Sequence, residues 1–330
     1  MGKKLVSVIV PAYNSGEFIE ESLRTILSQT WEAIEILVGD NASSDDTEAL
    51  VRNMMALDSR IKYFKHEVNI GYSKNCNKLI EEAKGGYICI YHSDDLYDPR
   101  IIEKQVEVLD SNEGVIGCFT NFSPMNSDGS EAKDKKPYSY SSNSVLVDHD
   151  YFIEKLLEER YNPIFCPSSM IRKNAYRKVG GYTENLNIIF DQDMWVRLLA
   201  LGNFIVLNEE LVKYRFHDKQ LSYVYRDPEQ VVVSPMVSHI ETYLKGYSTE
   251  YDCIYREKIE RLYAADFVMK AFLSVGYSEY SSFSAMLNKS KEYYLFSGGD
   301  HKNYSKIKAI QRLPVVCSYV ICKIIKLILK

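Results

Sequence analysis

Residues 6–47, VSVIVPAYNSGEFIEESLRTILSQTWEAIEILVGDNASSDDT, decide the fold of this chain. Residues 5–10 are apolar apart from Ser7 and rich in β-branched side chains, as in a central parallel strand buried on both faces. Residues 17–29 then carry apolar side chains at helical spacing, and a second apolar run follows at 34–38. The stretch therefore predicts a strand, a helix and a second strand.

The same alternation continues beyond this stretch. Short apolar runs at 61–64 and 87–91 predict two further strands, and residues 74–83 predict a helix between them. Hydroxyl and carboxylate side chains stand where two helices are expected to begin, and we expect N-caps at Ser15 and at Ser44 or Asp45. Strand and helix alternate with a period of about thirty residues, which predicts an α/β fold with a doubly wound, mostly parallel sheet flanked by helices.

Composition limits the class of protein. A length of 330 residues exceeds one average domain and favours a catalytic domain with an appendage. The net charge of -5 argues against a nucleic-acid binder. Seven cysteines without a C-x-x-C pair are typical of reduced core residues. The first apolar run is too short for a signal peptide, so we expect a cytoplasmic protein.

Four polar turns follow strand ends: residues 11–14, 40–43, 69–71 and 92–95. The carboxyl ends of parallel strands meet at one edge of a sheet, where open α/β sheets bind ligands. None of these turns is a G-x-G-x-x-G or a P-loop, so a dinucleotide oxidoreductase and a P-loop kinase are both disfavoured.

Two acidic segments suggest the chemistry. His92-Ser93-Asp94-Asp95 ends the fourth strand, and Phe190-Asp191-Gln192-Asp193 lies about a hundred residues later. Carboxylates at a strand end suit a hard cation that carries a diphosphate, and the second segment is a natural place for a general base. Together they indicate metal-assisted group transfer from a nucleotide.

The chain also resembles a known family. The opening stretch, NIGYSKNCNKLIEEAKGGYICIYHSDDLYDP (69–99), CPSSMIRKNAYRKVGGY (166–182), FDQDMWVRLLALG (190–202) and YRFHDKQLS (214–222) are together similar to the family 2 glycosyltransferases of bacterial surface-polysaccharide type. The resemblance implies an inverting enzyme of the GT-A fold that uses a nucleotide-diphospho-sugar donor. It implies a GT-A domain over 1–222, with a nucleotide half at about 1–98 and an acceptor half at about 99–222.

The resemblance implies a divalent cation, Mn²⁺ or Mg²⁺. Asp94 stands at the last position of the family's D-x-D motif and is the expected metal ligand, with Asp95 as a weaker second candidate and Asp98 as the better helix cap. His217, in a Y-R-x-H element, is expected to complete the metal shell or touch the diphosphate. His92 replaces the usual aspartate; it can contact the ribose, ligate the metal or simply pack at the strand end.

The resemblance also implies a nucleotide site, with the uracil of a UDP-sugar as the expected base. Asp40 matches the uracil-contacting aspartate, although a turn-capping role is the alternative. The other expected nucleotide contacts come from the strand-end turns and the helix after the third turn: Pro11, Ala12, Tyr13, Asn69, Lys74, His92, Ser93 and Asp95. A lone lysine on a helix is as often merely solvated, so Lys74 has that alternative.

Asp191 aligns with the family's catalytic aspartate, the second residue of a Glu-Asp pair in which Phe190 here replaces the glutamate. We prefer Asp191 to Asp193 as the base; a helix-capping role for Asp191 is compatible with it. Ser168 and Ser169 match an acceptor-side stretch, for which a simple strand is the alternative.

The remaining segments carry weaker signals. Residues 122–147 are polar and predict a mobile loop with room for a β-ribbon. Residues 223–330 predict a helical extension, with helical spacing at 231–244, 251–272 and 281–295. In the last eighteen residues, 313–330, three lysines share one face of an amphipathic helix: Lys323, Lys326 and Lys330. Peripheral binding to an anionic membrane and packing on the protein are both open.

The leading hypothesis is an inverting glycosyltransferase that transfers a sugar to a hydroxyl of a glycan or lipid-linked oligosaccharide. The alternative is a catalytically silent nucleotide-sugar-binding or scaffolding subunit, suggested by His92 and Phe190.

Overall fold

The computed structural model describes residues 2–158, 162–186, 189–220, 235–247, 255–260 and 262–263. The chain forms two compact units, the first of Met1–Leu156 with Tyr161–Gln220 and the second of Leu157–Arg160 with Leu221–Lys330. The sheet and every predicted catalytic, metal and nucleotide residue belong to the first unit.

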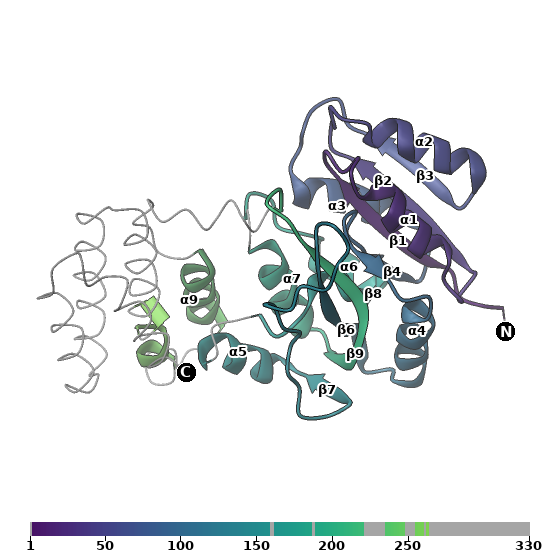
Figure 1. The fold of residues 1–330 in the computed structure, drawn as a ribbon. Helices are drawn as coiled ribbons and strands as arrows, with labels where there is room; N and C mark the ends of the chain where they lie inside the picture. Colours follow the sequence, from purple (N-terminus) through teal and green to yellow (C-terminus); the bar gives the residue numbers. More distant parts are fainter. Residues whose placement is uncertain are drawn as a thin grey trace, which may run out of the picture. The chain divides into compact units, whose positions relative to one another are not determined.

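One central sheet organises the first unit (Figure 1). Its order is β3-β2-β1-β4-β8-β6-β9-β5, and β7 pairs with β9. The strands are β1 (Val6–Ala12), β2 (Ile34–Asp40), β3 (Ile61–Lys65), β4 (Tyr87–Ile90), β5 (Leu96–Tyr97), β6 (Val115–Asn126), β7 (Ser144–Val147), β8 (Ser169–Arg172) and β9 (Asn203–Phe216). β1 to β4 pair in parallel, as do β6 and β9, whereas β5, β7 and β8 pair antiparallel. The predicted α/β fold with a mostly parallel sheet is confirmed.

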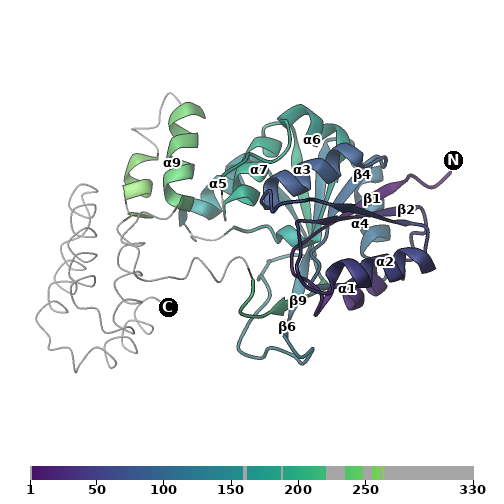
Figure 2. The same ribbon diagram turned by 90° about the horizontal axis from the view of Figure 1, so that it is seen from above.

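Helices cover both faces of the sheet. They are α1 (Ile19–Leu27), α2 (Thr47–Leu57), α3 (Tyr72–Glu82), α4 (Ile101–Ser111), α5 (His149–Glu158), α6 (Lys173–Val179) and α7 (Phe190–Leu199), with a 3₁₀ turn, η1 (Cys166–Ser168). Figure 2 shows α1, α2 and α4 on one face and α3, α6 and α7 on the other. Both faces of β1 are therefore buried, and Val8, Ile9 and Val10 are fully inaccessible to solvent. This double coverage explains why the strand is apolar at every position except Ser7.

The N-cap prediction at Ser15 is wrong. α1 begins at Ile19, the N-cap position is Phe18, and no side chain caps this helix. The Ser15 hydroxyl instead lies 2.8 Å from the hydroxyl of Ser93. At α2 the expectation is closer, because the Asp45 carboxylate accepts a hydrogen bond from the backbone N–H of Thr47 at 3.1 Å.

The polar segment 122–147 contains more regular structure than predicted. Residues 122–126 complete β6, and β7 occupies 144–147. Phe122, Met125 and Val147 are buried, and β9 is long enough to pair with both strands. The segment is rich in Ser and Lys, so its few buried apolar residues did not form a recognisable strand pattern in the sequence.

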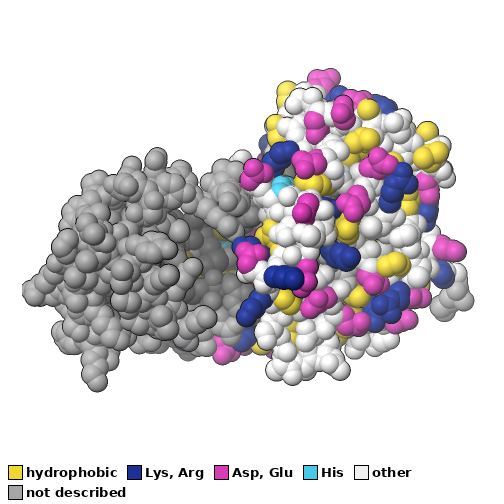
Figure 3. Space-filling view, in the orientation of Figure 1, with side chains coloured by type: hydrophobic (Ala, Val, Ile, Leu, Met, Phe, Trp, Pro, Cys, Tyr) yellow, Lys and Arg dark blue, Asp and Glu magenta, His cyan; other side chains and the backbone are white. Residues whose placement is uncertain are grey.

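The second unit contains α9 (Pro235–Tyr247), and residues 256–260 and 262–263 are also helical. The expectations at 281–295 and 313–330 lie outside the described residues. Among the described residues, no helix combines the length and apolar character needed to span a bilayer. On the face shown in Figure 3, acidic and basic side chains of the first unit are interspersed, without an extended surface of one sign.

Candidate active site

The four predicted turns meet at the carboxyl ends of the parallel strands. The backbone N–H of Asn41 donates to the carbonyl of Ala12 at 2.9 Å, which joins the turns after β2 and β1. The Ser15–Ser93 contact links the chain after β1 to the turn after β4. The side-chain amide of Asn41 donates to the side-chain oxygen of Asn69 at 2.8 Å, and this hydrogen bond joins the third turn to the turn after β2. Parallel strand register thus assembles one edge from four separate segments.

The predicted nucleotide residues differ in accessibility. The Tyr13 side chain is 52% exposed, whereas Pro11 and Ala12 are buried in β1. Asp40 is fully buried: one carboxylate oxygen accepts from the backbone N–H of Ser43 at 2.8 Å, and the other accepts from the hydroxyl of Tyr63 at 2.5 Å. One oxygen of Asp40 therefore holds the turn, as in the capping role considered above, and the other binds Tyr63 of β3.

Asn69 and Lys74 also have protein partners. The Asn69 side-chain oxygen accepts a second hydrogen bond from the backbone N–H of Gly71 at 2.9 Å. The Lys74 ammonium lies 3.2 Å from the carboxylate of Glu184, and both side chains are about half exposed, at 47% and 50%. An ion pair between two half-exposed side chains is weak, so the Lys74 ammonium is only loosely held by Glu184.

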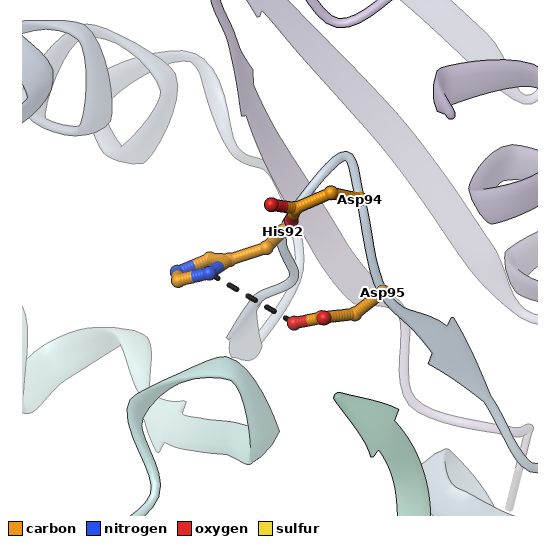
Figure 4. Close-up of side chains that lie close together, drawn as sticks. All are labelled: His92, Asp94 and Asp95. Carbon is orange, nitrogen blue, oxygen red and sulfur yellow. Dashed lines mark ion pairs between the residues drawn. The ribbon is translucent and has the colours of Figure 1, made fainter. Parts of the chain in front are cut away.

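The loop after β4 presents three possible metal ligands, His92, Asp94 and Asp95 (Figure 4). One ligand atom from each lies within 4.8 Å of the others, and His92 Nδ1 lies 3.9 Å from Asp95 Oδ2. Asp95 Oδ2 is buried and has no hydrogen-bond partner among the described residues, although Asp95 Oδ1 accepts from the backbone N–H of Arg215 at 2.9 Å. An orphaned buried carboxylate oxygen beside a second carboxylate and an imidazole fits a divalent cation.

The charges in this cluster are uneven. Burial, followed by the adjacent charge of Asp94, raises the pKa of Asp95 well above its ordinary value. Burial opposes ionisation of Asp94 as well, but the hydrogen bond from His217 and the nearby His92 outweigh it and lower its pKa. Burial also lowers the pKa of His92, which favours the neutral imidazole that metals bind.

His217 contacts the carboxylate of Asp94. Its Nε2 lies 2.9 Å from Asp94 Oδ2, and its ring packs 5.0 Å from the ring of Phe18, centroid to centroid. The structure thus groups His92 and Asp95 with Asp94 and places His217 as a partner of the Asp94 carboxylate. Such partners orient carboxylate ligands of metals.

Sequence reasoning missed Arg215, which is 2% exposed. Its guanidinium donates to the Asp94 carbonyl at 2.8 Å, to the Ser127 carbonyl at 2.9 Å and to the Glu21 carboxylate at 2.7 Å. Arg215 therefore ties the loop of Asp94 and Asp95 to α1 and to the segment after β6. Its place inside Tyr214-Arg215-Phe216-His217 was the available signal, because an arginine in a mostly apolar strand needs buried partners.

The second acidic segment forms the start of α7. Asp191 accepts hydrogen bonds from the backbone N–H of Gln192 at 2.7 Å and from the side-chain amide of Asn162 at 3.1 Å. Burial raises the pKa of Asp191 to about 6 despite these two hydrogen bonds. Asp193, by contrast, accepts from the Arg197 guanidinium at 2.6 Å and from the Thr183 hydroxyl at 2.7 Å. Among the described residues, Asp193 has a cationic partner in Arg197, whereas the hydrogen-bond donors to Asp191 are the neutral Gln192 N–H and the Asn162 amide.

Tyr72 connects the two acidic segments. Its hydroxyl lies 3.3 Å from His92 Nε2, and its ring stacks on Phe190 with centroids 4.4 Å apart and planes at 28°. Tyr72 therefore links the loop of His92 to the first turn of α7, in which Asp191 follows Phe190. Ser168 and Ser169, the predicted acceptor-side residues, are fully buried in η1 and β8 and are not surface contacts in this structure.

Known proteins share this sequence pattern. Residues 7–180 match the sequence profile of Glycosyl transferase family 2. The chain is 29% identical over 282 residues to an uncharacterized glycosyltransferase of Haemophilus influenzae, which covers 84% of this chain and 86% of that protein. It is 30% identical over 237 residues to the uncharacterized glycosyltransferase MJ1057 of Methanocaldococcus jannaschii, covering 71% and 78%. It is also 29% identical over 243 residues to the Bacillus subtilis protein named "Putative teichuronic acid biosynthesis glycosyltransferase TuaG", covering 69% and 90%.

Solved structures share the fold. TarS of S. aureus (residues 1–349), in complex with UDP-GlcNAc, superposes with a TM-score of 0.58 at 15% identity, covering 88% of this chain and 81% of that one. The mannosyltransferase PcManGT of Pyrobaculum calidifontis, in complex with GDP-Man and Mn²⁺, gives 0.54 at 14% identity, covering 97% and 87%. The profile spans more than half of the chain. This chain therefore belongs to glycosyltransferase family 2.

Proposed function

We propose that this glycosyltransferase is an inverting enzyme that moves a sugar from a UDP-sugar to a hydroxyl of a glycan or lipid-linked oligosaccharide. The observation that supports the proposal is the contact of Tyr72 with both His92 and Phe190, because it links the loop of the candidate cation ligands to the start of α7, where the proposed base Asp191 follows Phe190. In-line displacement at an anomeric carbon needs these two functions on opposite sides of the reacting carbon.

The reaction is a single displacement. Asp191 accepts the proton of the acceptor hydroxyl, the acceptor oxygen forms a bond to the anomeric carbon, and the bond from that carbon to the diphosphate oxygen breaks. The nucleoside diphosphate departs with the electron pair, and the anomeric configuration inverts. Burial without a cationic partner makes Asp191 a stronger base than an exposed carboxylate.

His92, Asp94 and Asp95 are the residues that would hold a divalent cation, Mn²⁺ or Mg²⁺, with His217 and Arg215 orienting Asp94. Such an ion, when bound, offsets the negative charge on the leaving diphosphate. On the same edge of the sheet, the exposed ring of Tyr13 is the proposed stacking surface for the base, and the segment at Asp40 the proposed wall beside it.

The domain roles and the acceptor follow from the same proposal. Residues of about 1–98 carry the nucleotide contacts, residues of about 99–222 the acceptor side, and 223–330 a helical extension. The likeness to TuaG supports a surface polysaccharide as the acceptor class. Thermal stabilisation by a panel of nucleotide-sugars, with and without Mn²⁺, tests the donor, because a ligand that binds the folded state raises its melting temperature. Stabilisation by none of them would contradict the proposal.

The silent-subunit alternative makes a different prediction for the same panel. A binding subunit is stabilised by a nucleotide-sugar but shows no Mn²⁺-dependent turnover, whether transfer to an acceptor or slow hydrolysis of the donor. Release of nucleoside diphosphate at a rate that depends on Asp191 would exclude it.

The rate should depend on pH through Asp191. Its pKa is raised to about 6, so the carboxylate fraction falls as the pH drops through that value. We expect kcat/KM to fall by about tenfold per pH unit below about 6. Asn162→Ala removes a hydrogen bond that favours the carboxylate, so this acidic limb should move to higher pH. If the acidic limb of the pH profile of kcat/KM is unchanged in Asn162→Ala, then the group that titrates there is not Asp191.

The end of the chain provides a prediction from sequence. We propose that residues 313–330 bind an anionic membrane surface through their apolar face and three lysines, each contributing about 1 kcal/mol near the surface. Reversing the charges of Lys323, Lys326 and Lys330 to glutamate should then weaken sedimentation with phosphatidylglycerol vesicles, and added salt should weaken it in the wild type. Phosphatidylcholine vesicles are the matched control. Equal sedimentation of both proteins would favour packing of this segment on the protein.

A further inference from the structure

The ring of His92 has a different partner on each nitrogen. Nδ1 faces Asp95 Oδ2 at 3.9 Å, as the dashed line in Figure 4 shows, and Nε2 faces the hydroxyl of Tyr72 at 3.3 Å. The first separation is too long for a hydrogen bond. It lies between the spacings of adjacent and opposite ligands of one octahedral ion, about 2.9 and 4.1 Å for bonds of 2.0–2.1 Å. The Nδ1 side is therefore the side on which a cation fits.

This arrangement fixes what the other nitrogen must do. A neutral imidazole binds a metal through a lone pair, and the proton then sits on the opposite nitrogen. With Nδ1 toward the cation, Nε2 carries the proton and donates it to the Tyr72 hydroxyl oxygen. Partners of this kind fix the tautomer and the orientation of metal-binding histidines.

Tyr72 is itself held by aromatic neighbours. Gly71 has a φ of +85° at the start of α3, a conformation that glycine adopts without strain, and Tyr72 follows as the first helical residue. Its ring stacks on Phe190 and meets Tyr182 edge-on at 6.5 Å between centroids. The Asn77 side chain hydrogen-bonds both the N–H and the carbonyl of Tyr182, at 2.7 and 2.9 Å, so α3 is tied to the segment that leads to Phe190.

We propose that Tyr72 is a positioning residue that sets the His92 ring for cation binding, and that Phe190 holds Tyr72 in place. The inference rests on the proposed cation site at His92, Asp94 and Asp95. It accounts for the two positions where the chain departs from its family. A glutamate at position 190 has no ring to stack on Tyr72, and an aspartate at position 92 has no tautomer to set. The imidazole of His92 and the phenyl ring of Phe190 therefore act together through Tyr72.

Tyr72→Phe tests the inference, because it removes the hydroxyl and keeps the stacked ring. The readout is the affinity for Mn²⁺, measured by titration calorimetry in the presence of whichever of UDP, GDP and dTDP the wild type binds best. We expect a loss of about 10–100-fold in Mn²⁺ affinity. Tyr87→Phe is the matched control, because it removes the hydroxyl of a buried tyrosine at the amino end of β4, away from the carboxyl-end turns, and it should leave Mn²⁺ affinity unchanged.

The mechanism is separated from general packing by a double-mutant cycle with His92→Asp. A carboxylate ligand needs no tautomer, so Tyr72→Phe should cost little Mn²⁺ affinity in that background. An equal loss in both backgrounds would overturn the role through His92, as would an unchanged affinity in Tyr72→Phe itself. Phe190→Leu, which keeps bulk but not the ring, should show a smaller loss in the same direction. A wild-type protein whose nucleotide binding ignores Mn²⁺ would overturn the cation site and, with it, this role of Tyr72.

Discussion

Asp94→Asn is expected to lower the transfer rate by about 10³-fold, because a cation at this site supplies several kcal/mol of stabilisation to the leaving diphosphate. The substitution keeps the size of the side chain and removes the charge that lies between His217 and the cluster of His92 and Asp95. The measurements are the initial rate of nucleoside-diphosphate release and the Mn²⁺-dependence of nucleoside-diphosphate binding. Both should be lost together.

Asp98→Asn is the matched control for this variant. Asp98 stands four residues further along the chain, and its carboxylate accepts a hydrogen bond from the backbone N–H of Arg100 at the start of α4. Its replacement should lower the melting temperature slightly and leave the Mn²⁺-dependence intact. Full turnover by Asp94→Asn, or turnover that persists in excess EDTA, would show that the cation is not required.

Asp191→Asn should lower kcat by a factor of about 10²–10⁴, the usual contribution of a positioned base. Asparagine can still accept from the Gln192 N–H and stay in the same place, but it cannot take the proton of the acceptor hydroxyl. Affinity for the nucleotide-sugar should stay near that of the wild type, because the proposed base contacts the acceptor hydroxyl and not the nucleotide. Single-turnover kinetics with a separate donor-binding measurement distinguishes the two effects.

Asp193→Asn is the comparison for the base. Its carboxylate is bonded to Arg197 and Thr183, so its loss should weaken the packing of α7 and lower the melting temperature more than the rate. A larger loss of rate in Asp193→Asn than in Asp191→Asn would assign the base to Asp193, about half a helical turn further along α7.

Much of the fold could be predicted because local pattern and tertiary environment agree. The apolar run of β1, interrupted only by Ser7, predicts a strand buried on both faces, and both faces are covered by helices. The position of Asp94 after such a strand predicts that it lies at the ligand-binding edge. Ser15 shows where local pattern fails. Its position before the helix predicts an N-cap, but its hydroxyl contacts the hydroxyl of Ser93, 78 residues away.

The site was less predictable where a residue's role depends on its partners. The sequence by itself determined the order of strands and helices, the chemical groups at the strand ends and the family, because these depend on neighbours along the chain. Only the tertiary structure decided that His217 hydrogen-bonds Asp94 across 123 residues, that Arg215 holds the same loop, and that Tyr72 joins His92 to Phe190. These contacts depend on how α3, α7 and β9 pack against the sheet, and the spacing of residues along the chain carries no record of that packing.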